Sequence, residues 1–169
     1  NGHGEIIDIL SEMTDIQESI VFMQFFAALN DTRCAVGTKV YKNRITKKAN
    51  KLQCKRIYKN ARLSADDYIK HLNRMDVVVL NNKLTCQMPT LLSILALNKR
   101  VFINEESPIY NYLNELGANV YSFKDLIECN SLSQAREFPP SQIPDQLKSY
   151  YTEENVYKLW KKWLDSING

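Results

Sequence analysis

The chain has 169 residues, of which 44% are hydrophobic and 24% charged, and its formal net charge is +3. This composition is typical of one globular domain and excludes disordered and fibrous proteins. The longest apolar stretches are far too short to cross a bilayer, and no signal-peptide pattern opens the chain, so we expect a cytoplasmic protein.

Histidine and cysteine are too few and too scattered to build most catalytic or metal sites. The chain has only His3 and His71, which excludes histidine-rich metal sites and disfavours a Ser/His/Asp triad. The four cysteines lack the close spacing of zinc or redox motifs, and we expect them to be reduced and mostly buried: Cys34, Cys54, Cys86 and Cys129. We therefore predict no metal ion and no cofactor.

The positive charge is concentrated in one segment. No Asp or Glu occurs between Asp31 and Asp66, whereas eleven of the 22 basic residues do, so the rest of the chain carries −8. Such asymmetry is expected where one edge of a fold meets phosphate, nucleic acid or an anionic membrane. A solvated face of lysines is an equally good interpretation.

Short apolar runs alternate with segments of helical period, which is the pattern of βαβ units around a parallel sheet. The runs at 76–80 (DVVVL) and 100–103 (RVFI) lack polar alternation, so we expect them to be central strands that are covered on both faces. The predicted strands are Glu5 to Leu10, Thr32 to Val36, Cys54 to Tyr58, Asp76 to Leu80, Arg100 to Ile103 and Asn119 to Phe123.

Capping signals mark the helices between these runs. Ile16, Ile20, Met23 and Ala27 recur at helical spacing and predict a helix over 15–29. Ser64 with Asp67 resembles a capping box. The other predicted helices begin at Pro89, at Ser107 and Pro108, and at Lys124, and the first two of these end at Asn98 and Gly117.

A last helix is predicted over 152–167, capped by Thr152. Its apolar positions form one stripe: Val156, Leu159, Trp160, Trp163 and Ile167. We expect residues 1–169 to form one domain with this helix packed across it, and part of the stripe to remain exposed for self-association or for a further subunit.

Residues 58–167 resemble the carboxy-terminal domain of GT-B glycosyltransferases in the order of capped helix, strand, loop, helix, strand, loop and helix. Within that fold the chain is most similar to the bacterial N-acetylfucosaminyl (4-acetamido-4,6-dideoxygalactose) transferases. The residues that carry the similarity are Asp67, Tyr68, Ile69, Leu72 and Asp76, then Leu91 and Leu92, and then Asn104, Glu106, Pro108 and Tyr110.

The resemblance implies a doubly wound, mostly parallel, Rossmann-like α/β domain that forms the donor-binding half of a glycosyltransferase of the hexosyltransferase type. It would act in surface polysaccharide or glycolipid synthesis with a nucleotide-diphosphate sugar as substrate. Many retaining members hold the donor with two glutamates eight residues apart. Thr85 and Ser93 stand at those positions here, which disfavours a retaining enzyme.

A sugar nucleotide is held by helix amino ends, hydroxyls and a few cations at the carboxyl edge of a parallel sheet. The residues predicted to lie there are Lys83, Thr85, Gln87, Thr90, Asn104 and Glu106. Each of two residues has an alternative role that involves no ligand: Thr90 could only cap its helix, and Glu106 could only stabilise the dipole of its helix. Ser107 is assigned to capping.

Three cations, Lys39, Lys42 and Arg44, follow the second predicted strand, where a pyrophosphate or an anionic lipid could bind. The alternative function is a non-enzymatic α/β module that contacts nucleic acid or an acidic partner through segment 39–62. Tyr41 and Tyr58 are the only aromatic residues among these cations, which disfavours a stacking surface for nucleic acid.

The catalytic base of an inverting transferase is not identified in this sequence. In the family it belongs to an amino-terminal acceptor domain, so the resemblance implies an apparatus that is incomplete without that domain. Asp8 or Glu12, at the end of the first predicted strand, could substitute for it. Peripheral contact with the inner membrane face is a further expectation from the basic segment.

Overall fold

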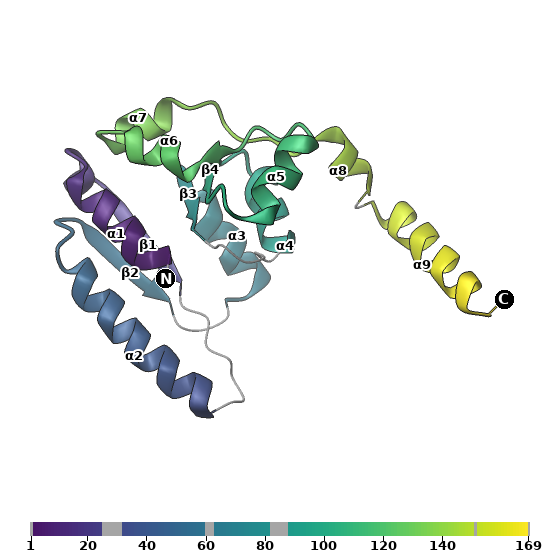
Figure 1. Cartoon of the computed structure of the whole chain (residues 1–169), viewed down its shortest axis with the longest axis horizontal. Helices are drawn as coiled ribbons and strands as arrows, with labels where there is room; N and C mark the ends of the chain where they lie inside the picture. Colours follow the sequence, from purple (N-terminus) through teal and green to yellow (C-terminus); the bar gives the residue numbers. More distant parts are fainter. Residues whose placement is uncertain (1, 25–31, 60–62, 82–87, 151, 169) are drawn as a thin grey trace.

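The computed structural model describes residues 2–24, 32–59, 63–81, 88–150 and 152–168. Strands and helices alternate through most of this part of the chain (Figure 1). The strands are β1 (Ile20–Gln24), β2 (Lys55–Lys59), β3 (Val77–Leu80), β4 (Arg100–Ile103) and β5 (Tyr121–Ser122). The helices are α1 (Gly2–Glu12), η1 (Ile16–Glu18, a 3-10 turn), α2 (Thr32–Ala49), α3 (Ala65–Asn73), α4 (Met88–Ala96), α5 (Pro108–Glu115), α6 (Phe123–Glu128), α7 (Leu132–Glu137), α8 (Asp145–Tyr150) and α9 (Glu153–Asn168).

The strands form two parallel sheets within the described residues. β1 pairs with β2, with Ile20 opposite Lys55. The second sheet has the order β3-β4-β5, with Val77 opposite Arg100 and Phe102 opposite Tyr121. The fold is therefore α/β with parallel strands, and the two runs predicted to be neighbours, β3 and β4, are paired.

Two hydrophobic clusters lie on opposite faces of β3 and β4. Val77, Val79 and Phe102 belong to the first cluster, which also contains buried side chains of α1, α2, α6 and α7. Val78, Leu80, Val101 and Ile103 belong to the second, together with side chains of α3, α4, α5 and α8. Because side chains alternate between the faces of a strand, helices cover both faces of these strands.

From residue 54 onward, the described part of the chain confirms most predicted element ends. The Oγ of Ser64 accepts a hydrogen bond from the Asp67 amide at 3.1 Å, which caps α3. Asn98 (φ 52°) and Gly117 (φ 77°) have the left-handed conformation that closes α4 and α5. The predicted strands over 54–58, 76–80 and 100–103 are β2, β3 and β4, with bounds shifted by at most one residue.

The predictions for the first fifty residues are wrong in three places. Glu5 to Leu10 is helical, within α1, because Ile7 and Leu10 are buried on one side of a helix. The helix predicted over 15–29 is a 3-10 turn followed by β1, whose Ile20-Val21-Phe22 run favours a strand. Residues 25–29 of that prediction lie outside the described residues.

The third error concerns Thr32 to Val36, which begins α2 instead of forming a strand. Ile45 and Ala49 are buried one helical turn apart further along, and the helix that they anchor extends back to Thr32. Short apolar runs do not distinguish a strand from a helical segment, and that ambiguity explains the error.

β5 is shorter than predicted because a helix cap interrupts it. The Oγ of Ser122 accepts from the Asp125 amide at 3.1 Å, and the Asp125 carboxylate accepts from the Ser122 amide at 2.6 Å. This reciprocal capping box starts α6 at Phe123, the last residue of the predicted strand. The segment predicted as a polar loop also contains α7 and α8.

The carboxy-terminal helix forms where it is predicted but does not pack across the domain. Thr152 caps α9, since its Oγ1 accepts from the Asn155 amide at 3.3 Å. Figure 1 shows α9 extending away from the sheets and helices of the body, next to α8. The expected packing therefore differs from the arrangement in this structure. Trp163 and Ile167 belong to α9, but their side chains lie outside the described set.

Candidate functional site

A buried pair of asparagines marks the carboxyl edge of the two central strands. Asn81 follows β3 and Asn104 follows β4, and parallel pairing of Leu80 with Ile103 brings them side by side. Both are only 6% exposed. Asn104 Nδ2 donates to Asn81 Oδ1 at 2.6 Å. A buried side-chain amide is costly unless it is hydrogen-bonded, so this bond fixes both side chains.

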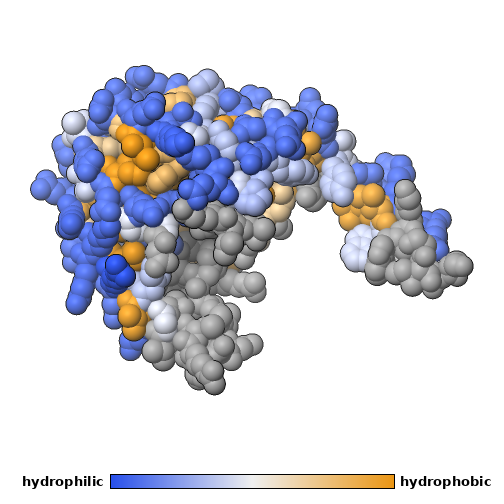
Figure 2. Space-filling view, in the orientation of Figure 1, coloured by the Kyte–Doolittle hydropathy of each residue, from blue (hydrophilic) through white to orange (hydrophobic). Residues whose placement is uncertain are grey.

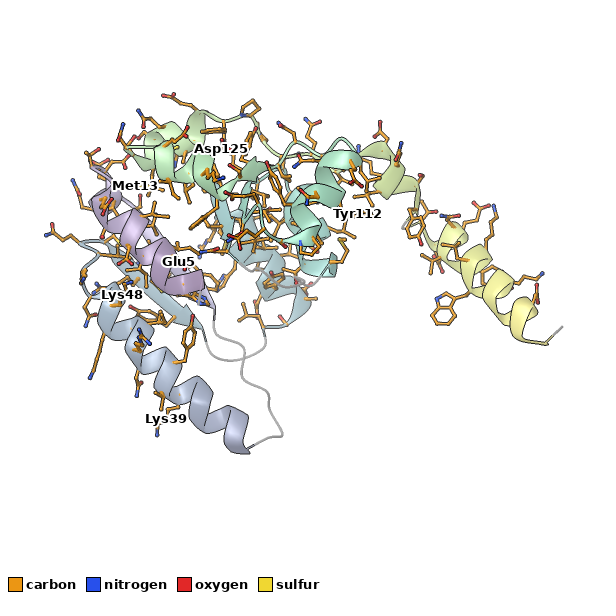
Figure 3. All side chains as sticks on the ribbon, in the orientation of Figure 1. Glu5, Met13, Lys39, Lys48, Tyr112 and Asp125 are labelled. Carbon is orange, nitrogen blue, oxygen red and sulfur yellow. The ribbon has the colours of Figure 1, made fainter. Side chains whose placement is uncertain are left out.

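The pair is linked to the amino end of α1. Asn81 Nδ2 donates to Glu5 Oε2 at 2.5 Å and to the Gly2 carbonyl at 3.5 Å. A Cβ atom on Gly2 would lie 2.2 Å from the Asn81 carbonyl oxygen, so glycine is required for this approach. Glu5 lies on the amino-terminal half of α1 (Figure 3). The carboxyl edge therefore has a continuous polar chain from Glu5 through Asn81 to Asn104.

The same network shapes the turn that starts α5. Asn104 Oδ1 accepts from the Glu106 amide at 2.8 Å, and its carbonyl accepts from the Ser107 amide at 2.9 Å. Pro108 then occupies the first turn of the helix. The turn directs the amino end of α5, with its positive dipole, toward this edge. Asn104 is thus a positioning residue whose polar groups are already used within the protein.

Ser107 does not cap α5 with its side chain, contrary to the prediction. Its backbone is extended, but its side chain makes no capping bond. The residue is fully buried, and its Oγ has no hydrogen-bond partner among the described residues. A buried hydroxyl in this state costs free energy, which makes it an unusual feature of this edge.

The remaining predicted donor residues have separate positions. The Glu106 side chain is exposed at the turn. Thr90 is half-buried in the first turn of α4, and its side chain is hydrogen-bonded to Tyr68 of α3. Burial raises the pKa of Tyr68, and the bond to Thr90 opposes that rise. Thr90 therefore joins α3 to α4. Lys83, Thr85 and Gln87 lie outside the described residues.

The predicted anion-binding residues lie on a helix, not in a loop after a strand. Lys39, Lys42 and Arg44 belong to α2, because the segment before them is helical. Lys39 and Arg44 are exposed and Lys42 is half-buried. Figure 3 shows Lys39 and Lys48 at different levels of α2, and Lys48 makes an ion pair with Asp8 of α1. The structure does not unite these cations with the asparagine pair in one site.

Sequence reasoning missed the parts of the network that come from α1. The strand predicted over 5–10 gives no reason to place Glu5 or Gly2 at this edge. Asn81 could have been identified from the sequence, because it directly follows the predicted strand 76–80. A polar residue at that position lies at the ligand-binding edge of many α/β folds.

A hollow of about 460 Å³ lies between α6 and α7, away from these residues. Asp125, Glu128 and Glu137 line it beside Cys129. Burial, followed by these carboxylates, raises the pKa of the Cys129 thiol, and burial also raises the pKa of Cys54. Both cysteines therefore remain protonated and poorly nucleophilic near neutral pH.

The described residues contain no group of three or more His, Cys, Asp or Glu side chains placed to hold a metal ion. In the same part of the chain, no helix is both long and apolar enough to span a membrane. The chain matches no protein-family model, no curated protein and no solved structure.

Proposed function

We propose that this chain is the donor-binding half of a glycosyltransferase, of the hexosyltransferase type, and that it binds a nucleotide-diphosphate sugar at the carboxyl edge of β3 and β4. The observation that carries the proposal is the buried Asn81–Asn104 pair at this edge, next to the amino end of α5. Ligands of parallel α/β folds bind outside the carboxyl ends of the strands. A role in surface polysaccharide or glycolipid synthesis follows from the sequence resemblance alone.

The arrangement of the two sheets supports a doubly wound fold of the GT-B carboxy-terminal type. Val21 and Met23 of β1 pack in the same cluster as Val77 and Val79 of β3. Placing β1 beside β3 gives the strand order β2-β1-β3-β4-β5. In that order the chain reverses its direction of winding between β1 and β3, and the crevice at such a reversal is the usual ligand site. Asn81 directly follows β3, so in that order it would lie on one side of such a crevice.

The donor would be held mainly by hydrogen bonds and helix dipoles. Among the described residues of this edge, Glu5, Glu105 and Glu106 are acidic, and Lys124 makes an ion pair with Glu105 at 3.3 Å. The diphosphate is therefore assigned to the amino ends of α5 and α4, where backbone N–H groups favour an anion. The exposed Glu106 carboxylate is assigned to a hydroxyl of the ribose or sugar, since it is a strong acceptor.

A thermal-shift panel of UDP-, GDP- and TDP-sugars tests this function. A ligand that binds only the folded state adds about 2.7 kcal/mol of stability at a hundred times its Kd. One class of sugar nucleotide should raise the Tm of the chain, and Glu106→Gln should reduce that shift. Glu115→Gln is the matched control, because Glu115 is exposed at the other end of α5. The absence of any shift, or an equal shift in both variants, contradicts the assignment.

The alternative function, a non-enzymatic binding module, is favoured by one observation. Lys39, Arg44 and Lys47 are exposed on α2, and Lys48 of the same helix makes an ion pair with Asp8. If this face binds nucleic acid, affinity for a random duplex should fall steeply with salt, and replacing the three cations by Gln should flatten the slope. No binding at low salt rejects this alternative.

A further inference from the structure

Glu5 is an exposed residue whose carboxylate is held in place by a buried polar pair. It lies in the first turn of α1, and its Oε2 accepts a hydrogen bond from Asn81 Nδ2 at 2.5 Å. Asn81 and Asn104, which are bonded to each other, are both only 6% exposed. An exposed glutamate ordinarily keeps its rotamer freedom, and ordering it costs entropy. Two buried amides therefore orient a side chain that faces solvent.

The negative charge of Glu5 is not neutralised by a cation among the described residues. Asp8, one turn further along α1, makes an ion pair with Lys48 of α2. Glu5 instead accepts from an uncharged amide, and within the described part of the chain its second oxygen, Oε1, accepts no hydrogen bond. An ionised carboxylate is a pure acceptor. Oε1 is therefore suited to a hydrogen-bond donor that comes from outside the protein.

The place of Glu5 at the carboxyl edge selects a hydroxyl as that donor. Glu5 is bonded to the residue that follows β3, whereas Glu106 follows β4 and precedes α5. Asn104 reaches toward Glu106, because its Oδ1 accepts from the Glu106 amide at 2.8 Å. A nucleotide-diphosphate sugar has a hydroxyl-bearing ring on each side of its diphosphate. With one ring at each end of this polar chain, both carboxylates meet hydroxyls and neither meets a phosphate, which it would repel.

We propose that Glu5 Oε1 accepts a hydrogen bond from a ligand hydroxyl, on the pentose of the nucleotide or on the transferred sugar, and so sets the direction of the ligand along this edge. This inference rests on the proposed function, which supplies the ligand. Asn81 and Asn104 are positioning residues that hold the carboxylate. Gly2 belongs to the same arrangement, since a Cβ there would collide with the Asn81 carbonyl oxygen and displace α1 from β3.

Glu5→Gln tests the proposal, because the amide oxygen of glutamine still accepts from Asn81 while its NH₂ group cannot accept from a hydroxyl. Calorimetric titration uses the sugar nucleotide that raises the Tm of the wild type. Its affinity for Glu5→Gln should be about tenfold lower, as expected when a charged acceptor is lost. Glu12→Gln is the matched control, since Glu12 is exposed at the other end of α1, and its affinity should equal that of the wild type.

Two ligands distinguish the source of the hydroxyl. If the pentose supplies it, Glu5→Gln should weaken the sugar nucleotide and the corresponding nucleoside diphosphate by the same factor. If the transferred sugar supplies it, only the sugar nucleotide should bind more weakly. Urea unfolding of each variant defines the conditions under which it is fully folded, and the titrations are made under those conditions.

The results that overturn this inference differ from the result that rejects the proposed function. Wild-type affinity of Glu5→Gln for both ligands overturns the inference and leaves the donor site intact. A loss that Glu12→Gln shares equally overturns it as well, because the effect would then come from the charge of the whole helix. A wild type that binds none of the sugar nucleotides rejects the proposed function, and this inference with it.

Discussion

Asp15 shows how one half-buried carboxylate can join segments that are far apart in the sequence. It accepts hydrogen bonds from the Leu132 amide at 2.7 Å, the Ser133 amide at 2.8 Å and the Ser133 hydroxyl at 2.6 Å. It therefore satisfies the first free N–H groups of α7, while the Ser131 hydroxyl accepts from the Gln134 amide. The bond from the Ser133 hydroxyl, with those from the two amides, lowers the pKa of Asp15, and burial partly opposes this.

We predict that Asp15→Asn destabilises the fold near neutral pH by about 1 kcal/mol, the usual cost of losing a helix cap. The folded state lowers the pKa of Asp15, so the charge stabilises the fold above the unfolded pKa. That stabilisation is lost as the pH falls through the folded pKa. Urea unfolding of both proteins as a function of pH measures the difference. A gap that stays constant into strong acid contradicts this role.

Two glycines of α1 should respond to alanine in opposite directions. At Gly2 a Cβ would collide with the Asn81 backbone, so Gly2→Ala should cost about 1 to 3 kcal/mol, as overpacking does. At Gly4 the nearest atom is the flexible Lys48 Nζ at 3.6 Å, so Gly4→Ala should stabilise the helix by up to about 1 kcal/mol. Chemical denaturation gives both values. A stabilising Gly2→Ala would show that α1 does not approach β3 this closely.

At the scale of elements, Asn98 ends α4 in the left-handed conformation with φ 52° and an exposed side chain. Asn98→Gly should leave stability unchanged or raise it slightly, because glycine adopts this conformation without strain. Asn98→Val should cost about 1 to 2 kcal/mol, since a branched side chain opposes it. Thermal unfolding of the two variants compares them. Equal stability of the two variants would contradict a left-handed conformation of residue 98 at the end of α4.

The elements that the sequence predicted well have explicit end signals. Ser64, Asn98 and Gly117 act through local bonds and backbone conformation, which do not depend on the rest of the fold. The first fifty residues lack such signals, and packing decides their structure: Ile7 and Leu10 become helical because α1 buries them against the first cluster. Glu5 joins the site through a contact between distant segments, and no local pattern predicts that contact.

At the scale of the whole molecule, three surfaces are separate. The carboxyl edge of β3 and β4 has the buried polar network, α2 has exposed cations, and α9 forms an apolar groove with α8. Figure 2 shows an orange, apolar area at the start of α9, beyond the main body of the molecule. The sequence placed Asn104 and Glu106 at this edge from the order of strands alone. The prediction that Lys39, Lys42 and Arg44 follow a strand is wrong because residues 32–36, predicted as that strand, are the start of α2.

Hydrogen exchange with and without a saturating nucleotide sugar is the sharpest test of the proposed donor site, because it locates a bound ligand as well as detecting it. Backbone amides in the Asn104–Ser107 turn and in the first turns of α5 and α4 should exchange more slowly when the ligand is bound. Amides of α2 and of the acidic hollow between α6 and α7 should be unaffected. Protection confined to α2 or to that hollow, with none at the carboxyl edge of β3 and β4, would contradict the proposed donor site.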